Sequence, residues 1–199
     1  MSQERDGELM LSQIRLRDGS HPRTLDVLSV PLLRPAPKPR QPENAVVAPV
    51  GWKLLQRPCE PSTATRLVRR ALATDGLIFG NNSDRVSFPK PGETLGSSLT
   101  AVSPLELRWE ITRSATGKRQ VRTQFWFATT YYDLVLTDEV WETKLRHLPV
   151  GTFECSAAGL SDESHVVLVI SLGEPFHGYC YKLVAGVLAL DRSTRRERG

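Results

Sequence analysis

Apolar and polar residues alternate along three stretches in the second half of the chain. The alternation covers residues 105–112, 121–127 and 132–136, and a turn containing Gly117 separates the first two. A period of two indicates a strand with one buried face. The first two stretches therefore predict a β-hairpin, and the third predicts a further strand. The apolar phase places four large side chains in the predicted core: Trp109, Phe125, Phe127 and Leu134.

The pattern changes to a helical period after the third strand. Asp138 is expected to cap a helix whose apolar side consists of Val140, Trp141 and Leu145 and which ends by Pro149. A helix at this place divides the strands into a first group of three and a later pair.

Two apolar runs follow this helix. Residues 166–172 and 179–190 predict a final hairpin, with residues 173–178 between its strands. The order strand, strand, strand, helix, strand, strand is that of the OB-fold, a five-stranded Greek-key barrel that binds oligonucleotides or oligosaccharides. We therefore predict a closed or nearly closed barrel from about residue 96 to residue 190. Other small barrels also begin with three consecutive strands, so the OB-fold is one of several barrels that fit.

The first part of the chain is less regular. Residues 24–30 predict a strand, and five prolines within residues 31–42 exclude a helix or a central strand and favour an extended path. This arm carries Arg34, Lys38 and Arg40. We interpret it as a stiff connector, and contact with phosphates is the alternative.

A helix and a loop lead from the arm to the alternating strands. Residues 62–74 have apolar positions at helical spacing and predict an amphipathic helix with a solvated arginine face. Residues 80–98 are rich in Gly, Asn, Ser and Pro and predict a loop. The predicted domain boundary lies in this loop.

The composition limits the class of protein. The chain has 199 residues, of which 40% are hydrophobic and 24% charged, a balance typical of globular proteins. No apolar run approaches the roughly 20 residues that cross a bilayer, and the charged N-terminus does not form a secretory signal. We therefore expect a cytoplasmic protein with no membrane partner. Cys59, Cys155 and Cys180 are too widely spaced for a disulfide framework, so we expect reduced thiols.

Patterns for catalysis and metal binding are absent from the sequence. His21, His147, His165 and His177 do not lie at metal-ligand spacing. Neither a Gly-rich phosphate loop nor a Gly-x-Ser-x-Gly motif occurs. His177 and Cys180 could form a nucleophilic pair, but Cys180 lies in an apolar strand, where inert buried thiols are common. We predict a protein that is not an enzyme and uses no cofactor.

Charge favours a binding surface instead. The 26 Lys and Arg residues against 22 Asp and Glu give a net charge of +4, which permits a polyanionic partner. Basic residues around the first predicted hairpin are followed by aromatic ones, a combination with which proteins bind single strands. The predicted nucleic-acid-binding residues, two of them in the closing hairpin, are Arg113, Lys118, Arg119, Arg122, Trp126, His177 and Lys182.

These residues have different expected roles. Arg119 and Arg122 would contact phosphates, Trp126 would stack on a base, and His177 with Lys182 would border the groove. The alternative is a solvated face of mixed charge. Three acidic residues lie among the basic ones: Glu106, Glu110 and Asp133.

Several segments resemble one known family. The most specific is residues 171–188 (SLGEPFHGYCYKLVAGVL). The others, in order, are residues 25–33 (LDVLSVPLL), 41–44 (QPEN), 84–86 (DRV), 96–99 (GSSL), 132–134 (YDL), 137–138 (TD) and 140–142 (VWE). From about residue 24 to residue 190 the chain resembles the bacterial dual OB-containing domain family.

The resemblance implies two OB-like barrels in one chain and nucleic-acid or nucleotide recognition in bacterial defence. Residues 1–20 lack the opening strands of the family, which implies an incomplete first barrel with a free sheet edge. The expected fold is thus mainly β with one or two short helices. Residues 1–80 would hold the incomplete barrel, the arm and the helix, and residues 81–199 the second barrel and a basic C-terminal tail.

Two functions remain after these arguments. The first is a non-catalytic module that binds single-stranded nucleic acid or a nucleotide. The second is a protein-interaction scaffold with no affinity for nucleic acid. Binding to phosphates weakens steeply as salt rises, whereas a protein-binding module shows no binding or a flat salt response.

Overall fold

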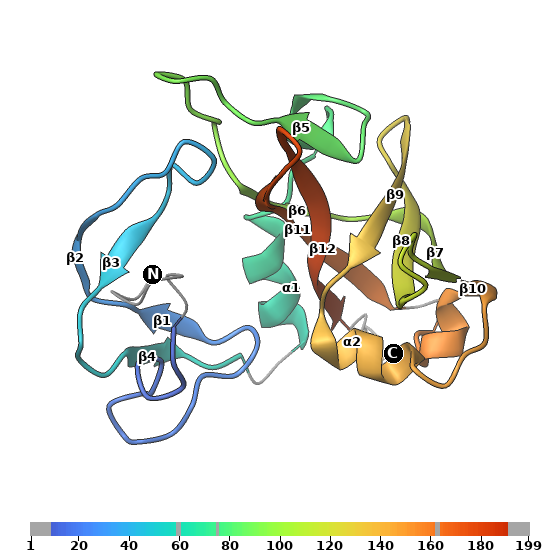
Figure 1. Ribbon diagram of the computed structural model, residues 1–199. Coiled ribbons are helices and arrows are strands. Elements are labelled where there is room, and N and C mark those ends of the chain that lie inside the picture. Colours follow the sequence, from blue (N-terminus) through green and yellow to red (C-terminus); the bar gives the residue numbers. More distant parts are fainter. Residues whose placement is uncertain (1–8, 59–60, 75, 162–163, 191–199) are drawn as a thin grey trace, which may run out of the picture. The chain divides into compact units, whose positions relative to one another are not determined.

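The computed structural model describes residues 9–58, 61–74, 76–161 and 164–190 (Figure 1). The basic C-terminal tail expected at residues 191–199 lies outside these residues, as does Cys59. In the part of the chain that is described, no helix is long and apolar enough to cross a membrane.

The chain forms two compact units. Unit 1 comprises Met1–Ala64 and Pro89–Ser97, and unit 2 comprises Thr65–Phe88 and Ser98–Gly199. The domain boundary that the sequence indicates near residue 80 stays a prediction.

Unit 1 contains two separate two-stranded sheets. β1 (Val27–Ser29) pairs with β4 (Lys53–Gln56), and β2 (Leu32–Pro35) pairs with β3 (Ala45–Val47), both antiparallel. Within the described residues no further strand joins either sheet. β1 confirms the strand expected over residues 24–30, although it is confined to Val27–Ser29.

An ion pair joins the start of β1 to the end of β4. The Arg57 guanidinium donates to both carboxylate oxygens of Asp26, with Nε–Oδ1 at 2.8 Å and Nη2–Oδ2 at 2.6 Å. These hydrogen bonds hold the pKa of Asp26 at about 2. The pair stabilises a unit that has few buried apolar side chains of its own.

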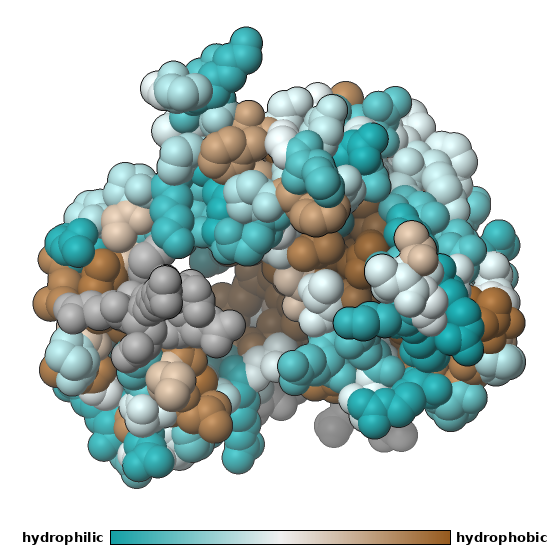
Figure 2. Space-filling view, viewed as in Figure 1, coloured by the Kyte–Doolittle hydropathy of each residue, from teal (hydrophilic) through white to brown (hydrophobic). Residues whose placement is uncertain are grey.

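The proline-rich arm forms β2 and the turn that follows. β2 pairs only with β3, so it is an edge strand, where proline is tolerated. All four of its residues are exposed, and Figure 2 shows hydrophobic residues at the surface over β2. Among the basic residues of the arm, Arg34 is exposed, whereas Arg40 is buried.

Unit 2 is built on one sheet of eight strands. They are β5 (Arg85–Ser87), β6 (Leu99–Val102), β7 (Leu105–Arg113), β8 (Arg119–Phe127), β9 (Thr130–Leu136), β10 (Gly151–Glu154), β11 (His165–Phe176) and β12 (Tyr179–Leu190). The hydrogen-bonded order is β10-β7-β8-β9-β12-β11-β6, and β5 also pairs with β12. β9 and β12 are parallel, and the other strand pairs are antiparallel.

The helices are short. They are α1 (Pro61–Arg69), α2 (Glu139–Leu145) and the 3₁₀ segments η1 (Ile78–Gly80) and η2 (Cys155–Ala158). α1 confirms the predicted amphipathic helix, although it ends before residue 74. Its Ala64 and Val68 side chains are buried, as the helical spacing predicts.

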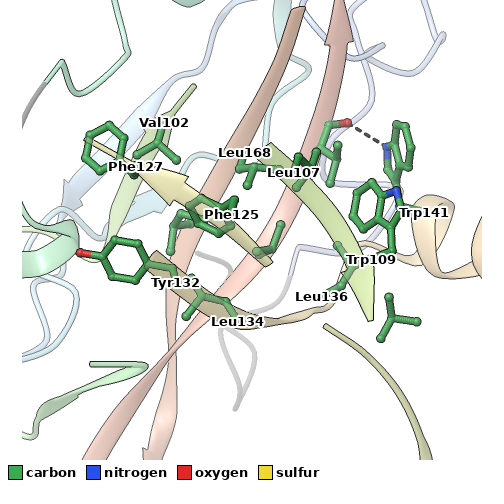
Figure 3. Close-up of a cluster of buried hydrophobic side chains, with 14 of the residues drawn as sticks. Val102, Leu107, Trp109, Phe125, Phe127, Tyr132, Leu134, Leu136, Trp141 and Leu168 are labelled. Atoms are coloured by element: carbon green, nitrogen blue, oxygen red, sulfur yellow. Dashed lines mark hydrogen bonds between the residues drawn. The ribbon is translucent and has the colours of Figure 1, made fainter. Parts of the chain in front are cut away.

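The predicted hairpin and the core of unit 2 are confirmed. β7 and β8 pair in register around Trp109 and Thr123, and a turn with Gly117 at φ 77° joins them. Trp109 and Phe125 are completely buried, and Phe127 and Leu134 are nearly so. Figure 3 shows these side chains in one cluster.

Among the described residues, hydrogen bonds do not close the expected ring of strands, because β10 and β6 are the two ends of the sheet. Instead, the chain itself joins β6, at one end of the sheet, to β7, next to the other end. β6 pairs with β11, and only Ser103 and Pro104 separate it from β7, which pairs with β8. β6 and β7 are thus two halves of one bent strand, interrupted where Pro104 lacks a backbone donor.

The predicted cap of α2 is confirmed. Oδ1 of Asp138 accepts hydrogen bonds from the amides of Val140 and Trp141, and Oδ2 accepts one from the amide of Val187 in β12. The indole of Trp141 donates to the Val187 carbonyl at 2.9 Å (Figure 3). The capping residue therefore also fixes α2 to the sheet. The helix ends at Leu145, before Pro149.

Two expectations about loops are wrong. Residues 173–178 do not separate β11 from β12, because the strands continue to a two-residue turn at His177 and Gly178. Both have positive φ, 49° and 81°, as the commonest tight hairpin turn requires. The segment 80–98 also contains a strand, β5, which the Gly- and Ser-rich composition concealed.

Truncating Phe125 to Ala should destabilise unit 2 by about 3–5 kcal/mol, because the fully enclosed ring leaves a cavity that the sheet cannot fill. Urea denaturation measures the effect. Leu105→Ala is the control, since Leu105 is 58% exposed and its loss should cost less than about 0.5 kcal/mol. Equal effects of the two substitutions would show that the Phe125 ring is not enclosed.

Candidate nucleic-acid interface

The predicted binding residues lie at two opposite ends of the sheet of unit 2. β8 and β9 are antiparallel, and β9 is parallel to β12 through the pair Val135 and Leu183. The starts of β9 and β12 therefore lie at one end, and the β7–β8 turn lies at the other (Figure 1). At about 3.3 Å per residue, Arg119 and Trp126 are about 23 Å apart along β8. The structure does not bring the first hairpin's turn together with His177.

Three predicted residues lie around the β7–β8 turn and are exposed: Arg113, Lys118 and Arg119. The Arg119 guanidinium donates to the carbonyls of Leu145 and Leu148, at 2.8 and 3.4 Å, beyond the last turn of α2. Arg119 thus faces the C-terminal end of α2, on the same side of β8 as the buried Val121.

This contact brings further basic residues to the turn. Lys144, Arg146 and His147, on either side of Leu145, are exposed. We call Arg113, Lys118, Arg119, Lys144 and Arg146 the basic end. In the described residues, no carboxylate lies within ion-pairing distance of any of them. Sequence reasoning missed Lys144 and Arg146, because only the contact with Arg119 places α2 beside the turn.

The middle of the sheet carries paired charges. The Arg122 guanidinium donates to Oδ1 and to the backbone carbonyl of Asp133, both at 2.7 Å. Arg108 lies 3.0 Å from a carboxylate oxygen of Glu154. The cross-strand carboxylates therefore offset these two positive charges. Arg122 faces outward as predicted, but it is engaged with Asp133.

Trp126 lies on the outer face beyond these pairs. It is 40% exposed and meets Tyr131 edge to face, with ring centroids 5.6 Å apart; Tyr131 is 45% exposed. Partial burial raises the pKa of Tyr131, and the nearby carboxylates of Asp133 and Glu110 raise it further. The two rings form an aromatic pair open to solvent at the end of β8, where a flat ligand can stack.

A second aromatic group, of which the sequence predicted only His177, lies at the same end. The guanidinium carbon of Arg85 in β5 lies 4.8 Å from the ring centroid of Tyr179 and 5.7 Å from that of Tyr181. Phe176 and His177, at the tip of the closing hairpin, have ring centroids 4.1 Å apart. The pairing of β5 with β12 joins residues about a hundred positions apart, so no local pattern indicated it.

Lys182 does not border a groove. It is 1% exposed, and its ammonium group donates to the backbone carbonyl and Oδ1 of Asn81, at 2.8 and 2.9 Å. The Tyr132 ring centroid lies 5.2 Å away. Burial lowers the pKa of Lys182 to about 8, against the opposing effect of the Asp84 carboxylate. This buried position makes Lys182 an internal anchor rather than a phosphate contact.

A family comparison agrees with this architecture. The family model described as the dual OB-containing domain matches residues 1–187. The chain belongs to the dual OB-containing domain family. The match begins upstream of residue 24, where the resemblance in the sequence began, so the N-terminal residues of this dual OB-containing domain are part of the family match. No curated protein and no solved structure matches the chain.

This dual OB-containing domain presents exposed aromatic rings and charged side chains. Across the described residues, no group of three His, Cys, Asp or Glu side chains could hold a metal ion. Cys155 and Cys180 are free thiols. The exposed rings and the basic end offer stacking and charge instead.

The stability of the fold should rise with pH between about 8 and 10. Unfolded Lys182 has a pKa of about 10.4, so in this window the unfolded chain keeps a proton that the folded protein has released, and folding is favoured as pH rises. Below about pH 8 both states are protonated and the full cost of burying the charge remains.

Urea midpoints measured at about pH 7 and pH 9.5 test this prediction. Lys182→Met should remove the rise, because it has no proton to release, and Lys182→Arg should also remove it, because arginine stays charged. Parallel pH dependences in the wild type and both variants would show that Lys182 does not titrate in this range.

Proposed function

We propose that unit 2 is a non-catalytic module that binds single-stranded nucleic acid or a nucleotide, with phosphates at the basic end and bases at the Trp126–Tyr131 pair. The observation that carries this proposal is the arrangement of β8, with the basic end at its start and the Trp126–Tyr131 pair at its finish. Proteins that bind single strands combine a cationic surface for phosphates with aromatic rings for bases.

The distribution of charge supports separate roles for the two ends. Arg108 and Arg122 are paired with carboxylates in the middle of the face, so a phosphate there must compete with Glu154 or Asp133. In the described part of the chain no carboxylate pairs with a side chain of the basic end, although Arg119 donates to the Leu145 and Leu148 carbonyls. Phosphates would therefore bind mainly at the basic end, and bases would stack at Trp126.

Membership of the dual OB-containing domain family supports this proposal, since OB-folds commonly bind oligonucleotides. The proposal includes the cytoplasmic, bacterial defence setting to which the composition and the family resemblance point. The predicted residues Arg113, Lys118, Arg119 and Trp126 keep their expected roles in it. Arg122 would play a secondary part because of its bond to Asp133.

A protein-interaction scaffold is the second candidate function, and a groove in unit 1 favours it. The groove has a volume of about 320 Å³ and is lined by Leu32, Leu33, Arg34, Pro35, Pro42, Glu43, Asn44 and Ala45. Leu32 and Leu33 are 59% and 55% exposed. A partner chain would cover these apolar side chains, and such a module would show no salt-dependent affinity for a single strand.

Removing two charges from the basic end should weaken binding and reduce its dependence on salt. For the double variant Lys118→Gln and Arg146→Gln, the slope of log affinity against log salt should become shallower by about 1.4, because each lost phosphate contact removes about 0.7 for a single strand. Fluorescence anisotropy with a labelled oligonucleotide at several salt concentrations measures this slope.

The matched control removes two positive charges elsewhere. Arg66 and Arg69 are exposed on α1, and replacing both with Gln changes the net charge by the same amount. The control should keep the wild-type slope. Equal slopes for the basic-end variant and the wild type would place the phosphate contacts elsewhere.

Trp126→Ala should reduce the affinity for a single strand by about 1–3 kcal/mol without changing the salt slope, because stacking releases no counterions. The same anisotropy titration measures both quantities, and Trp126→Phe is the control that keeps a ring. An alanine variant that binds as tightly as the wild type would exclude Trp126 from the site.

A further inference from the structure

The second aromatic group of unit 2 forms one outward surface on three strands. Cross-strand neighbours in an antiparallel sheet point to the same face, and the register pairs Arg85 with Tyr181, and Tyr179 with Phe176. We call Arg85, Phe176, Tyr179 and Tyr181 the Arg85 cluster. The intervening Val86 and Cys180 are buried, so the cluster faces solvent.

Contacts within the Arg85 cluster hold its rings in place. Nη1 of Arg85 donates to the Tyr181 hydroxyl at 3.2 Å while the guanidinium lies over the Tyr179 ring. The Phe176 and Tyr181 ring centroids are 6.4 Å apart. Phe176 is nevertheless 61% exposed and Tyr179 is 39% exposed. The surface is ordered before any ligand arrives, which lowers the entropic cost of binding.

The sheet register places the Arg85 cluster level with the Trp126–Tyr131 pair. Val135 in β9 is paired with Leu183 in the parallel strand β12. Tyr131 lies four residues before Val135, and Tyr179 lies four residues before Leu183. The two tyrosines therefore lie the same number of residues from this pair, toward the same end of the sheet.

Strand β5 separates the two aromatic groups. It pairs with residues 179–181 of β12, on the same edge of β12 to which β9 is paired at residues 183 and 184. In the described residues β5 is hydrogen-bonded to β12 and not to β9, so the two groups lie at least two strand spacings, about 10 Å, apart. Stacked nucleotides advance about 3.4 Å each, so a strand that reaches both groups needs at least about three nucleotides.

We propose that the Arg85 cluster is a second base-stacking site, so that the ligand is a single strand of several nucleotides and not a mononucleotide. This inference rests on the proposed function and specifies the class of its ligand. A mononucleotide reaches one aromatic group, whereas a longer strand stacks on both. Affinity then rises with strand length until both groups are occupied.

The Arg85 cluster contributes stacking and not phosphate binding. The Asp84 carboxylate lies 3.9 Å from the Arg85 guanidinium and offsets its charge. Rings that stack on bases release no counterions, so their removal lowers affinity at every salt concentration by the same factor. This behaviour separates the Arg85 cluster from the basic end.

The test compares strand lengths in ring-deletion and ring-conserving variants. Oligodeoxythymidylates of roughly 2, 4, 8 and 12 nucleotides cover the range of OB-fold site sizes, about 4–16 nucleotides, and thymidine monophosphate serves as the mononucleotide. The deletion variant is Phe176→Ala with Tyr179→Ala. The matched control, Phe176→Tyr with Tyr179→Phe, keeps both rings in the exposed positions. Thermal unfolding of both variants confirms that each is folded.

In the deletion variant, each ring lost should weaken the binding of the longest strands by about fivefold to a hundredfold relative to the wild type. Its salt slope should be unchanged, and its affinity for the dinucleotide should equal that of the wild type. The ring-conserving variant should behave as the wild type with every strand.

Three outcomes would overturn the inference. Wild-type affinity of the deletion variant for all lengths would leave the Arg85 cluster as a surface for a protein partner. Equal affinity of the wild type for the monophosphate and the longest strand would show a nucleotide site at Trp126 alone, with the proposed function intact. Absence of binding to any strand would reject the proposed function itself.

Discussion

Unit 2 depends on how one edge of β12 is shared between two strands. β9 pairs with residues 183 and 184, and β5 pairs with residues 179–181. Lys182 lies at the change of partner: its amide donates to the Asp84 carbonyl, and its ammonium group holds Asn81. The Tyr132 hydroxyl, in β9, donates to the same Asn81 carbonyl. The segment before β5 is thus fastened to both strands from inside the fold, and Arg85 is carried to the outer face.

A buried lysine is a costly way to make this connection. Desolvation disfavours its charge, and no carboxylate in the described residues lies within ion-pairing distance of it. An apolar residue would pack without that cost, but it would leave the two part-buried acceptors of Asn81 with fewer donors. Lys182 therefore contributes to specifying where β5 pairs, at the expense of stability near neutral pH.

Sequence periodicity predicted the parts of the fold that are set by short-range pattern. The phase of Trp109, Phe125 and Leu134, and the cap at Asp138, follow from the residues alone. The buried face of β12 could also be predicted from the alternation, since Cys180, Lys182 and Val184 share it. The charge of Lys182, however, led to the prediction of a surface position. The pairing of β5 with β12 is fixed by contacts distant in sequence, so composition indicated a loop instead.

The charge distribution of the candidate site could also be predicted from the sequence only in part. Counting basic residues on the first hairpin treats Arg113, Arg119 and Arg122 as equivalent, but the fold gives each a different neighbour. Arg119 is held by carbonyls at the end of α2, and Arg122 by Asp133. The contact that engages Arg119 also brings Lys144 and Arg146 to the turn. The cationic surface is consequently made by a hairpin and a helix together, and the position of α2, fixed by Asp138 and Trp141 on β12, decides where the proposed phosphate-binding side chains lie.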